Sequence, residues 1–300
     1  MEKEAIREKE PVFTMNLSLA GKYSVVTNAN TTKSVSSKLG KQDRERLREC
    51  TPSECEYGIV IRTNAKELLQ RDDLSALETE CSQLIMQMDK LLREGIHRTC
   101  YSQIYQAPAS YFTELRDHTS WEYEQIVTDD EMIYHEVEGF LSTYMPEKKE
   151  QLTLYQDEAI TLHKLYGIET KIQELLQTKV WLNSGAYLVI EQTEAMYVID
   201  VNSGKNIAKK PTDSYILSIN LEATKEIMRQ IRLRNLSGII LIDFINMEET
   251  SMKEQLMQEL KRIARLDRIP TTIVDMTALG LVEITRKKTK RSLKAQLNLS

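Results

Sequence analysis

The sequence predicts an α/β protein built from mixed α+β sheets, and three observations lead to this class. Two runs of apolar residues, 195–199 and 239–242, contain many β-branched side chains and are typical of strands buried on both faces. Several longer stretches place apolar residues at helical spacing. In the last third of the chain the predicted strands alternate with predicted helices, which indicates a mixed α/β sheet.

Size and composition are ordinary for a soluble globular protein. The chain has 300 residues, of which 41% are hydrophobic and 28% charged, enough for one large or two to three modest domains. No apolar run approaches the roughly 20 residues of a membrane span, and the charged segment 1–7 lacks the apolar core of a signal peptide. The four cysteines form no CxxC pair and have no histidine at ligand spacing. We therefore expect free thiols, no membrane partner and a cytoplasmic location.

The first hundred residues predict a small sheet followed by a long helix. Alternating apolar and polar residues in 11–27 predict a hairpin around 20–22. A charged helix is expected over 41–50 and a short strand over 57–62. Leucine and methionine residues recur at helical spacing from 64 to 94, and we interpret this stripe as core packing.

The middle of the chain mixes short strands and helices, and the end alternates them. The mixed part has elements at 121–127, 134–145 and 159–166. A helix over 166–176 then leads to strands at 180–182 and 187–190, joined by a turn at 183–185. Further helices are expected at 214–234 and 249–266.

Two acids end the two apolar runs. Asp200 and Asp243 each follow a predicted strand, and a helix lies between them in the sequence, so both can reach the same end of adjacent strands. Two carboxylates in that arrangement suit a hard divalent cation such as Mg²⁺. Each acid alone can also be explained as a helix cap or a turn residue. The pair, together with Asn202 two residues after the first acid, favours a metal site.

The residues around these acids resemble the ribonuclease E/G family. Four blocks match the family in order over about a hundred residues, which is more specific than a short pattern. They are 191–203 (EQTEA … IDVNS), 220–238 (NLEA … RQIRLRNLSG), 240–247 (ILIDFINM) and 280–288 (GLVEITRKK). The resemblance implies three regions. Residues 1–104 resemble a domain that senses an RNA 5′ end, 105–178 a ribonuclease-H-like domain, and 179–300 a DNase-I-like catalytic domain.

The resemblance implies an endoribonuclease that hydrolyses single-stranded RNA. Asp200 and Asp243 match the family's metal ligands, with Mg²⁺ as the expected ion and Mn²⁺ as the alternative. Asn202 matches the residue that orients the scissile phosphate, and the products would carry 5′-phosphate and 3′-hydroxyl ends. Glu194 is a weaker candidate that either supports the metal ligands or is an exposed charge at the start of a strand.

A second site follows from the same resemblance. Arg62 and Thr63 match the pair that holds a 5′-monophosphate, and Gly21 and Val25 fall in the hairpin that assists them. Arginine offers a planar pair of donors and threonine a hydroxyl, which suit a terminal phosphate. The position at which the family adds a further basic residue is Pro270 here, which cannot donate a charged hydrogen bond.

Basic residues near the end of the chain are candidates for the RNA path. The net charge is −5, but phosphate binding depends on local clusters, and one such cluster is Arg286, Lys287 and Lys288 after a predicted strand. The predicted helix 221–234 also carries four basic residues, Lys225, Arg229, Arg232 and Arg234. These either line the RNA path or form a solvent face paired with Glu222 and Glu226. A cap by Asn220 is expected at the start of this helix.

Two family features are not matched by this sequence. The oligonucleotide-binding insert would precede residue 1, and the CPxC zinc link would follow Ser300. We therefore expect a minimal family member with no zinc and no zinc-linked dimer; a monomer or a different dimer interface are the alternatives. The same features motivate a rival function, a catalytically weak RNA-binding or scaffold protein with the family fold. A metal-dependent phosphatase or DNase is a more distant alternative.

Overall fold

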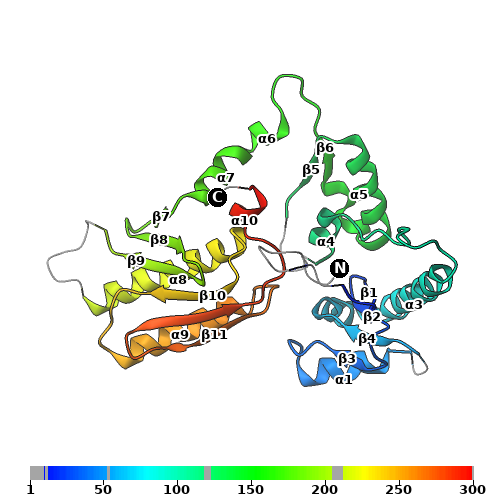
Figure 1. The fold of residues 1–300 in the computed structure, drawn as a ribbon, viewed down its shortest axis with the longest axis horizontal. Coiled ribbons are helices and arrows are strands. Elements are labelled where there is room, and N and C mark those ends of the chain that lie inside the picture. Colours follow the sequence, from blue (N-terminus) through cyan, green and yellow to red (C-terminus); the bar gives the residue numbers. More distant parts are fainter. Residues whose placement is uncertain (1–9, 11–12, 53–54, 118–122, 205–211, 299–300) are drawn as a thin grey trace. The chain divides into compact units, whose positions relative to one another are not determined.

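Figure 1 shows the protein as a computed structural model, which describes residues 10, 13–52, 55–117, 123–204 and 212–298. Contacts within the chain divide it into two compact units, one formed by residues 13–162 and one that holds residues 163–300. Position 104 lies inside the first unit and position 178 inside the second, and the three-region division stays a prediction. The predicted α/β class with mixed sheets is confirmed. Within the described residues, no helix is both long and apolar enough to cross a membrane, and all four cysteines are free, as predicted.

A four-stranded sheet organises the start of the first unit. Its strands lie in the order β1-β2-β4-β3, with β3 and β4 parallel and the other pairs antiparallel. The strands are β1 (Ser18–Ala20), β2 (Ser24–Thr27), β3 (Lys33–Val35) and β4 (Gly58–Ile61). The hairpin expected around residues 20–22 is therefore the β1-β2 hairpin, and the strand expected over 57–62 is β4. Helix α1 (Lys41–Glu49) matches the expected charged helix.

The long helix expected from 64 to 94 is divided in two. A single turn of 3₁₀ helix (Thr63–Ala65) leads into α2 (Lys66–Arg71), and α3 (Ser75–Gly95) follows. The helical path breaks at Asp72, whose φ of 54° lies in the left-handed region that aspartate tolerates better than most residues. The apolar stripe is core packing as predicted, because α3 buries Leu77, Cys81 and Met88.

The rest of the first unit is a smaller cluster of helices on a two-stranded parallel sheet. The strands are β5 (Ile126–Thr128) and β6 (Leu152–Leu154). The helices are α4 (Ser110–Asp117), α5 (Glu131–Tyr144) and a 3₁₀ segment (Pro146–Gln151). Its core is Val137, Leu141, Met145 and Leu152. Part of the element expected over 121–127 lies outside the described residues.

The second unit is built on one six-stranded sheet with the strand order β11-β12-β10-β9-β8-β7. Strands β9 and β10 are parallel, and every other neighbouring pair is antiparallel. The strands are β7 (Lys179–Trp181), β8 (Tyr187–Gln192), β9 (Met196–Asn202), β10 (Gly238–Asp243), β11 (Thr271–Met276) and β12 (Leu281–Arg286). The helices are α6 (Leu162–Leu165), α7 (Ile168–Leu176), α8 (Asp213–Leu233), α9 (Thr250–Ala264) and α10 (Leu293–Gln296).

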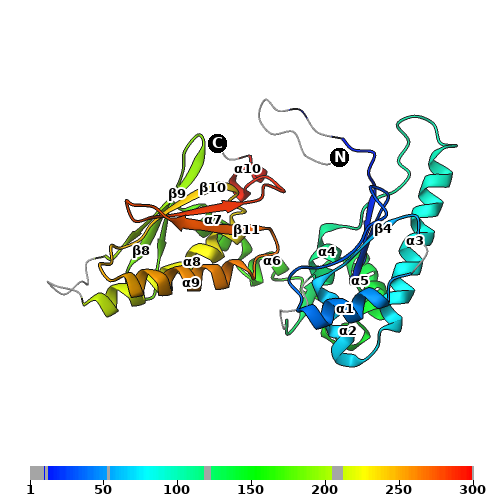
Figure 2. The ribbon, with the colours of Figure 1, turned by 90° about the horizontal axis from the view of Figure 1, so that it is seen from below.

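Helices α8 and α9 pack on one face of this sheet, as the view from below shows (Figure 2). The two faces therefore differ along each strand. In β10, Ile240 and Ile242 are fully buried, whereas Ile239, which points to the opposite face, is 47% exposed. The prediction that this run is buried on both faces is wrong, because α8 and α9 cover one face and the alternate residues of β10 on the other face are exposed or half-buried. We call the other side, to which the alternate residues point, the open face.

Candidate functional site

Asp200 and Asp243 are direct neighbours across two parallel strands. Asp200 lies near the end of β9 and Asp243 at the end of β10, and the two residues are partners in the strand register. Neighbouring strands are roughly 4.8 Å apart, and register partners point to the same face. Their sequence neighbours Ile199 and Ile242 are buried under the helices, so both carboxylates belong to the open face. The predicted juxtaposition of the two acids is present in the structure.

Asn202 joins this pair from the same strand as Asp200. It lies two residues further along β9, so its side chain is on the open face as well. Its Nδ2 donates a hydrogen bond of 2.5 Å to Oδ2 of Asp200. This bond fixes the orientation of the Asp200 carboxylate and holds the amide next to the two acids.

The donor set of this cluster fits a hard cation. Among the residues that the structure describes, no group of three or more acids, histidines or cysteines is close enough to form a closed metal cage. Two carboxylates and a neighbouring amide are nevertheless oxygen donors of the kind Mg²⁺ prefers, and Mg²⁺ usually keeps several waters. The residues present therefore suit an ion held by two carboxylates and open to substrate.

A buried asparagine anchors the segment that follows Asp243. Asn220 lies within α8, fully buried, where its Nδ2 donates to the Ile245 carbonyl at 2.8 Å and its Oδ1 accepts from the Ile245 N–H at 3.2 Å. The prediction that Asn220 caps this helix is wrong, because α8 begins earlier, at Asp213. Its two hydrogen bonds instead tie the chain two residues after Asp243 to the helix below the sheet.

The residues of the expected phosphate site come together in the first unit. Arg62 follows β4, and its Nη1 donates to the Gly21 carbonyl at 2.7 Å, which joins β4 to the β1-β2 hairpin. Thr63 Oγ1 lies 2.8 Å from Ser36 Oγ. Val25 pairs with Val60 in the adjacent strand. Arg62, Thr63, Gly21 and Val25 are thus placed around one end of the four-stranded sheet.

The Arg62 guanidinium already forms an ion pair with a carboxylate. Asp117 at the end of α4 forms an ion pair of 2.6 Å with Arg62 Nη1 and one of 2.9 Å with Arg116 Nε. Burial alone would raise the pKa of the Asp117 carboxyl, but the hydrogen bonds and charges of Arg62 and Arg116 outweigh burial and lower it. Asp117 is therefore an anion, and any other anion at Arg62 has to compete with it.

A second buried acid holds the hairpin itself. Glu80 of α3, only 6% exposed, accepts hydrogen bonds from the backbone N–H of Lys22 at 2.7 Å, Tyr23 at 3.0 Å and Ser24 at 2.8 Å. A Cβ at Gly21 would lie 2.4 Å from this carboxylate, so the approach requires glycine. Glu80 is not among the predicted site residues, although its position between Leu77 and Cys81 on the apolar side of α3 indicates a buried partner.

Comparison with known proteins identifies the family. The model of the Ribonuclease E/G family matches residues 18–289. This chain belongs to the ribonuclease E/G family. It is 35% identical over 298 residues to Ribonuclease G of Haemophilus influenzae, covering 97% of this chain and 59% of that protein. It is 33% identical to Ribonuclease G of Escherichia coli over 294 residues, with the same coverage, and 30% identical to Ribonuclease E of Synechocystis over 299 residues, covering 97% of this chain and 43% of that protein. The chain thus spans 59% or less of the length of these relatives.

One predicted RNA contact of this ribonuclease E/G chain needs correction. Arg286 is only 4% exposed, and its guanidinium donates to Asp267 at 2.8 Å, to Asn235 Oδ1 at 2.9 Å and to the Leu236 carbonyl at 2.9 Å. A side chain so enclosed has a structural role and does not contact an RNA phosphate. Lys287 and Lys288 are exposed and remain candidates. Pro270 precedes β11, where its carbonyl accepts from the Lys287 N–H.

The remaining candidates are separated from the carboxylates. Glu194 lies in the exposed turn between β8 and β9, six residues before Asp200, and a strand of that length spans roughly 20 Å. It therefore does not support the metal ligands. The basic residues of α8 belong to the helix-covered side of the sheet, where Arg229 pairs with Glu226 at 2.9 Å and Arg234 is buried. This favours the solvent-face explanation for Arg229.

Proposed function

We propose that this protein is a metal-dependent endoribonuclease that hydrolyses single-stranded RNA in the cytoplasm, in RNA processing or decay, to 5′-phosphate and 3′-hydroxyl products. The observation that carries this proposal is the register pairing of Asp200 with Asp243 on the open face, beside Asn202. Membership of the ribonuclease E/G family and similarity to proteins named Ribonuclease G and Ribonuclease E support the choice of RNA as substrate.

Each of the three residues has a separate task in this proposal. Asp200 and Asp243 hold the ion, for which we propose Mg²⁺ with Mn²⁺ as the alternative, and no zinc. When bound, the ion supplies a water of lowered pKa and neutralises charge on the phosphate. Asn202 orients the scissile phosphate, and its hydrogen bond to Asp200 keeps that carboxylate in a fixed orientation. In this proposal an RNA strand passes over these three side chains on the open face.

The Arg62 site binds a 5′-monophosphate in the same proposal. Arg62 and Thr63 supply the guanidinium and hydroxyl donors, and the hairpin at Gly21 and Val25 supplies backbone groups. The terminal phosphate would replace the Asp117 carboxylate as the anion on Arg62. Because Asp117 is already charged and hydrogen-bonded, this exchange lowers the net gain from binding the phosphate. We therefore expect a modest preference for monophosphorylated ends.

Cleavage of a 5′-monophosphorylated, fluorescent single-stranded RNA in Mg²⁺ tests the proposal. The wild-type chain is compared with Asp200→Asn and Asp243→Asn, and each sample is repeated in EDTA. We expect cleavage that disappears in both variants and in EDTA. RNA binding without cleavage by the wild-type chain at high concentration would instead support the scaffold function. Single-stranded DNA and a phosphomonoester, run in parallel, would detect a DNase or phosphatase.

A further inference from the structure

Two aromatic rings and a lysine form a cluster on the open face beside the carboxylates. The cluster consists of Lys179 and Trp181 on the edge strand β7 and Tyr187 on β8. Trp181 is the register partner of Tyr187, and Tyr187 is in turn the register partner of Asn202. Lys179 partners Val189, which partners Asp200. The cluster and the acids therefore share one face of one sheet.

The distances from the acids are short. Tyr187 is one strand spacing from Asn202, roughly 4.8 Å, and Lys179 is two spacings from Asp200, roughly 10 Å. A nucleotide next to the one held at the carboxylates can reach across such a distance. The sheet itself sets this placement, because the three residues of the cluster, Asp200 and Asn202 all lie in regular strands.

The three side chains hold one another in place. The Trp181 and Tyr187 ring centroids are 5.1 Å apart at an interplanar angle of 58°. Lys179 Nζ lies 3.9 Å from the Trp181 ring centroid and 3.7 Å from the Tyr187 ring centroid, which is cation–π distance for both rings. The two rings and the Lys179 ammonium group are therefore in mutual contact on the open face.

Much of the tryptophan nevertheless remains uncovered. Trp181 is 63% exposed, although a tryptophan on an edge strand would gain from burial. An exposed aromatic face with a cation beside it is the combination by which proteins bind single-stranded nucleic acid, since bases stack on the ring and the cation meets the backbone. A purely aliphatic ligand would leave the Lys179 charge without an anionic partner, whereas a nucleotide offers both a ring and a phosphate.

We propose that Lys179, Trp181 and Tyr187 form a stacking subsite for a nucleobase of single-stranded RNA, next to the nucleotide at Asp200 and Asp243. This rests on the proposed function, because it uses the same RNA strand. The base stacks on the exposed surface of Trp181, Tyr187 supports that ring from the Asn202 side, and Lys179 neutralises a neighbouring phosphate. Stacking tolerates every base, so the subsite positions the strand without selecting a sequence.

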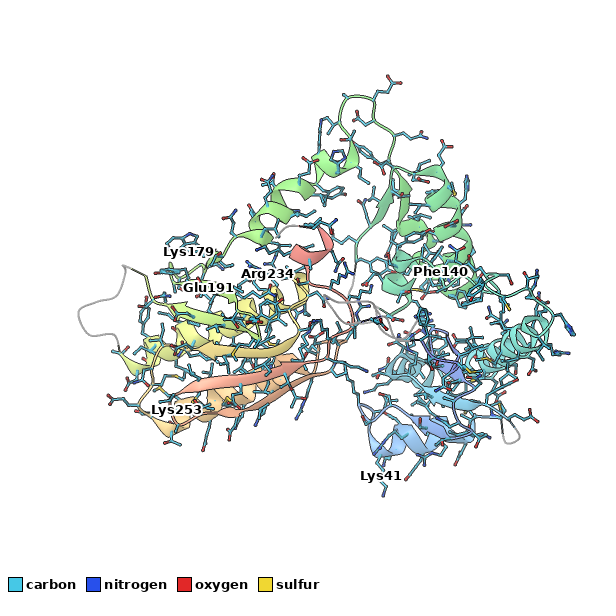
Figure 3. The ribbon with its side chains drawn as sticks, in the orientation of Figure 1. Lys41, Phe140, Lys179, Glu191, Arg234 and Lys253 are labelled. Atoms are coloured by element: carbon cyan, nitrogen blue, oxygen red, sulfur yellow. The ribbon has the colours of Figure 1, made fainter. Side chains whose placement is uncertain are left out.

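Binding experiments without catalysis test the subsite. In an Asp200→Asn chain that carries Trp121→Phe, Trp181 is the remaining tryptophan, and its fluorescence is titrated with a single-stranded RNA. We expect quenching. Trp181→Ala should weaken binding about 5- to 150-fold, the range for loss of one stacked base, and Trp181→Phe should restore most of it. Lys253→Ala serves as the control for Lys179→Ala, since Lys253 is on α9 at the helix-covered side (Figure 3). Tyr166→Ala controls for loss of an exposed aromatic ring.

RNAs with a single abasic position, moved along the strand, locate the stacked base. At one position, the abasic site should weaken binding of the RNA to the chain that carries Trp181. The Trp181→Ala variant should bind this abasic RNA and the intact RNA equally well. Equal effects in both chains, or unquenched fluorescence with bound RNA, would overturn the subsite. If the wild-type chain cleaves RNA and Trp181→Ala binds and cleaves it equally well, only the subsite is refuted. Absence of both binding and cleavage in the wild-type chain would refute the proposed function.

Discussion

The anchor at Asn220 gives a prediction that separates folding from the geometry of the acids. Replacing Asn220 by alanine removes two hydrogen bonds to Ile245 and leaves a backbone N–H and carbonyl of a half-buried residue without their partner. An unmet buried polar group costs about 1–3 kcal/mol, and Ile245 can regain part of this from water. We therefore expect the free energy of unfolding to fall by about 1–3 kcal/mol.

The same change should loosen the end of β10. Ile245 lies two residues after Asp243, so the released segment lets this carboxylate move relative to Asp200. We expect RNA cleavage by Asn220→Ala to require more Mg²⁺ than the wild-type chain, at a temperature where both are folded. Thr224→Val is the matched control, because Thr224 is buried in the same helix but its hydroxyl bonds only the Asn220 carbonyl.

Magnesium titrations of cleavage rate and urea unfolding curves supply the two measurements. Asn220→Asp loses the donor and buries a carboxylate against the Ile245 carbonyl, so it should destabilise the chain at least as much as alanine. An alanine variant that loses stability but keeps the wild-type Mg²⁺ dependence would refute the anchoring argument, since its hydrogen bonds would then serve folding alone.

Other predictions concern the buried pairs and the exposed lysines. Arg286→Ala should cost about 3–5 kcal/mol in urea unfolding, because it removes the cation that faces the buried Asp267 carboxylate. Burial raises the pKa of Asp267, but Arg286 lowers it more. The stabilisation that Asp267 contributes is therefore complete at pH values above the ordinary carboxyl pKa of 3.8 and is lost as the pH falls below it. Asp267→Asn should flatten this acid limb of the plot of stability against pH. Replacing Lys287 and Lys288 by alanine should leave stability unchanged and reduce the salt slope of RNA binding by about 0.7 for each lysine that meets a phosphate. Glu80→Ala should destabilise the first unit by at least about 2 kcal/mol, measured by unfolding, because three backbone N–H groups lose their acceptor.

The sequence predicts the acidic pair because local patterns define both strands. Asp200 and Asp243 each end an apolar run, and parallel neighbours bring such ends to one edge of a sheet. The apolar runs alone do not predict on which face of the sheet the two acids lie. It depends on which side α8 and α9 cover, and continuous apolar runs favour burial on both sides even though only Ile240 and Ile242 of β10 are fully buried.

Local patterns do not predict the roles of several charged residues, because their partners are distant in the sequence. Arg286 and its neighbour Lys287 are alike by type and position. The strand alternation turns the first inward to Asp267, nineteen positions before it, and the second outward. Glu80 likewise bonds to a hairpin that lies 56 to 58 positions earlier. No local pattern encodes such pairs, although an isolated acid on an apolar helix face indicates that a partner exists.

The sheet separates stability from chemistry by its two faces. The helix-covered face holds the apolar core, and the buried anchors Asn220 and Arg286 fix the ends of β10 and β12 from that side. The open face carries Asp200, Asp243 and Asn202, with the rings of β7 and β8 beside them. Because alternate residues of one strand serve different faces, a substitution on the open face can change substrate binding with little effect on the core. Substitutions on the open face therefore test the proposed RNA contacts while the core under α8 and α9 stays intact.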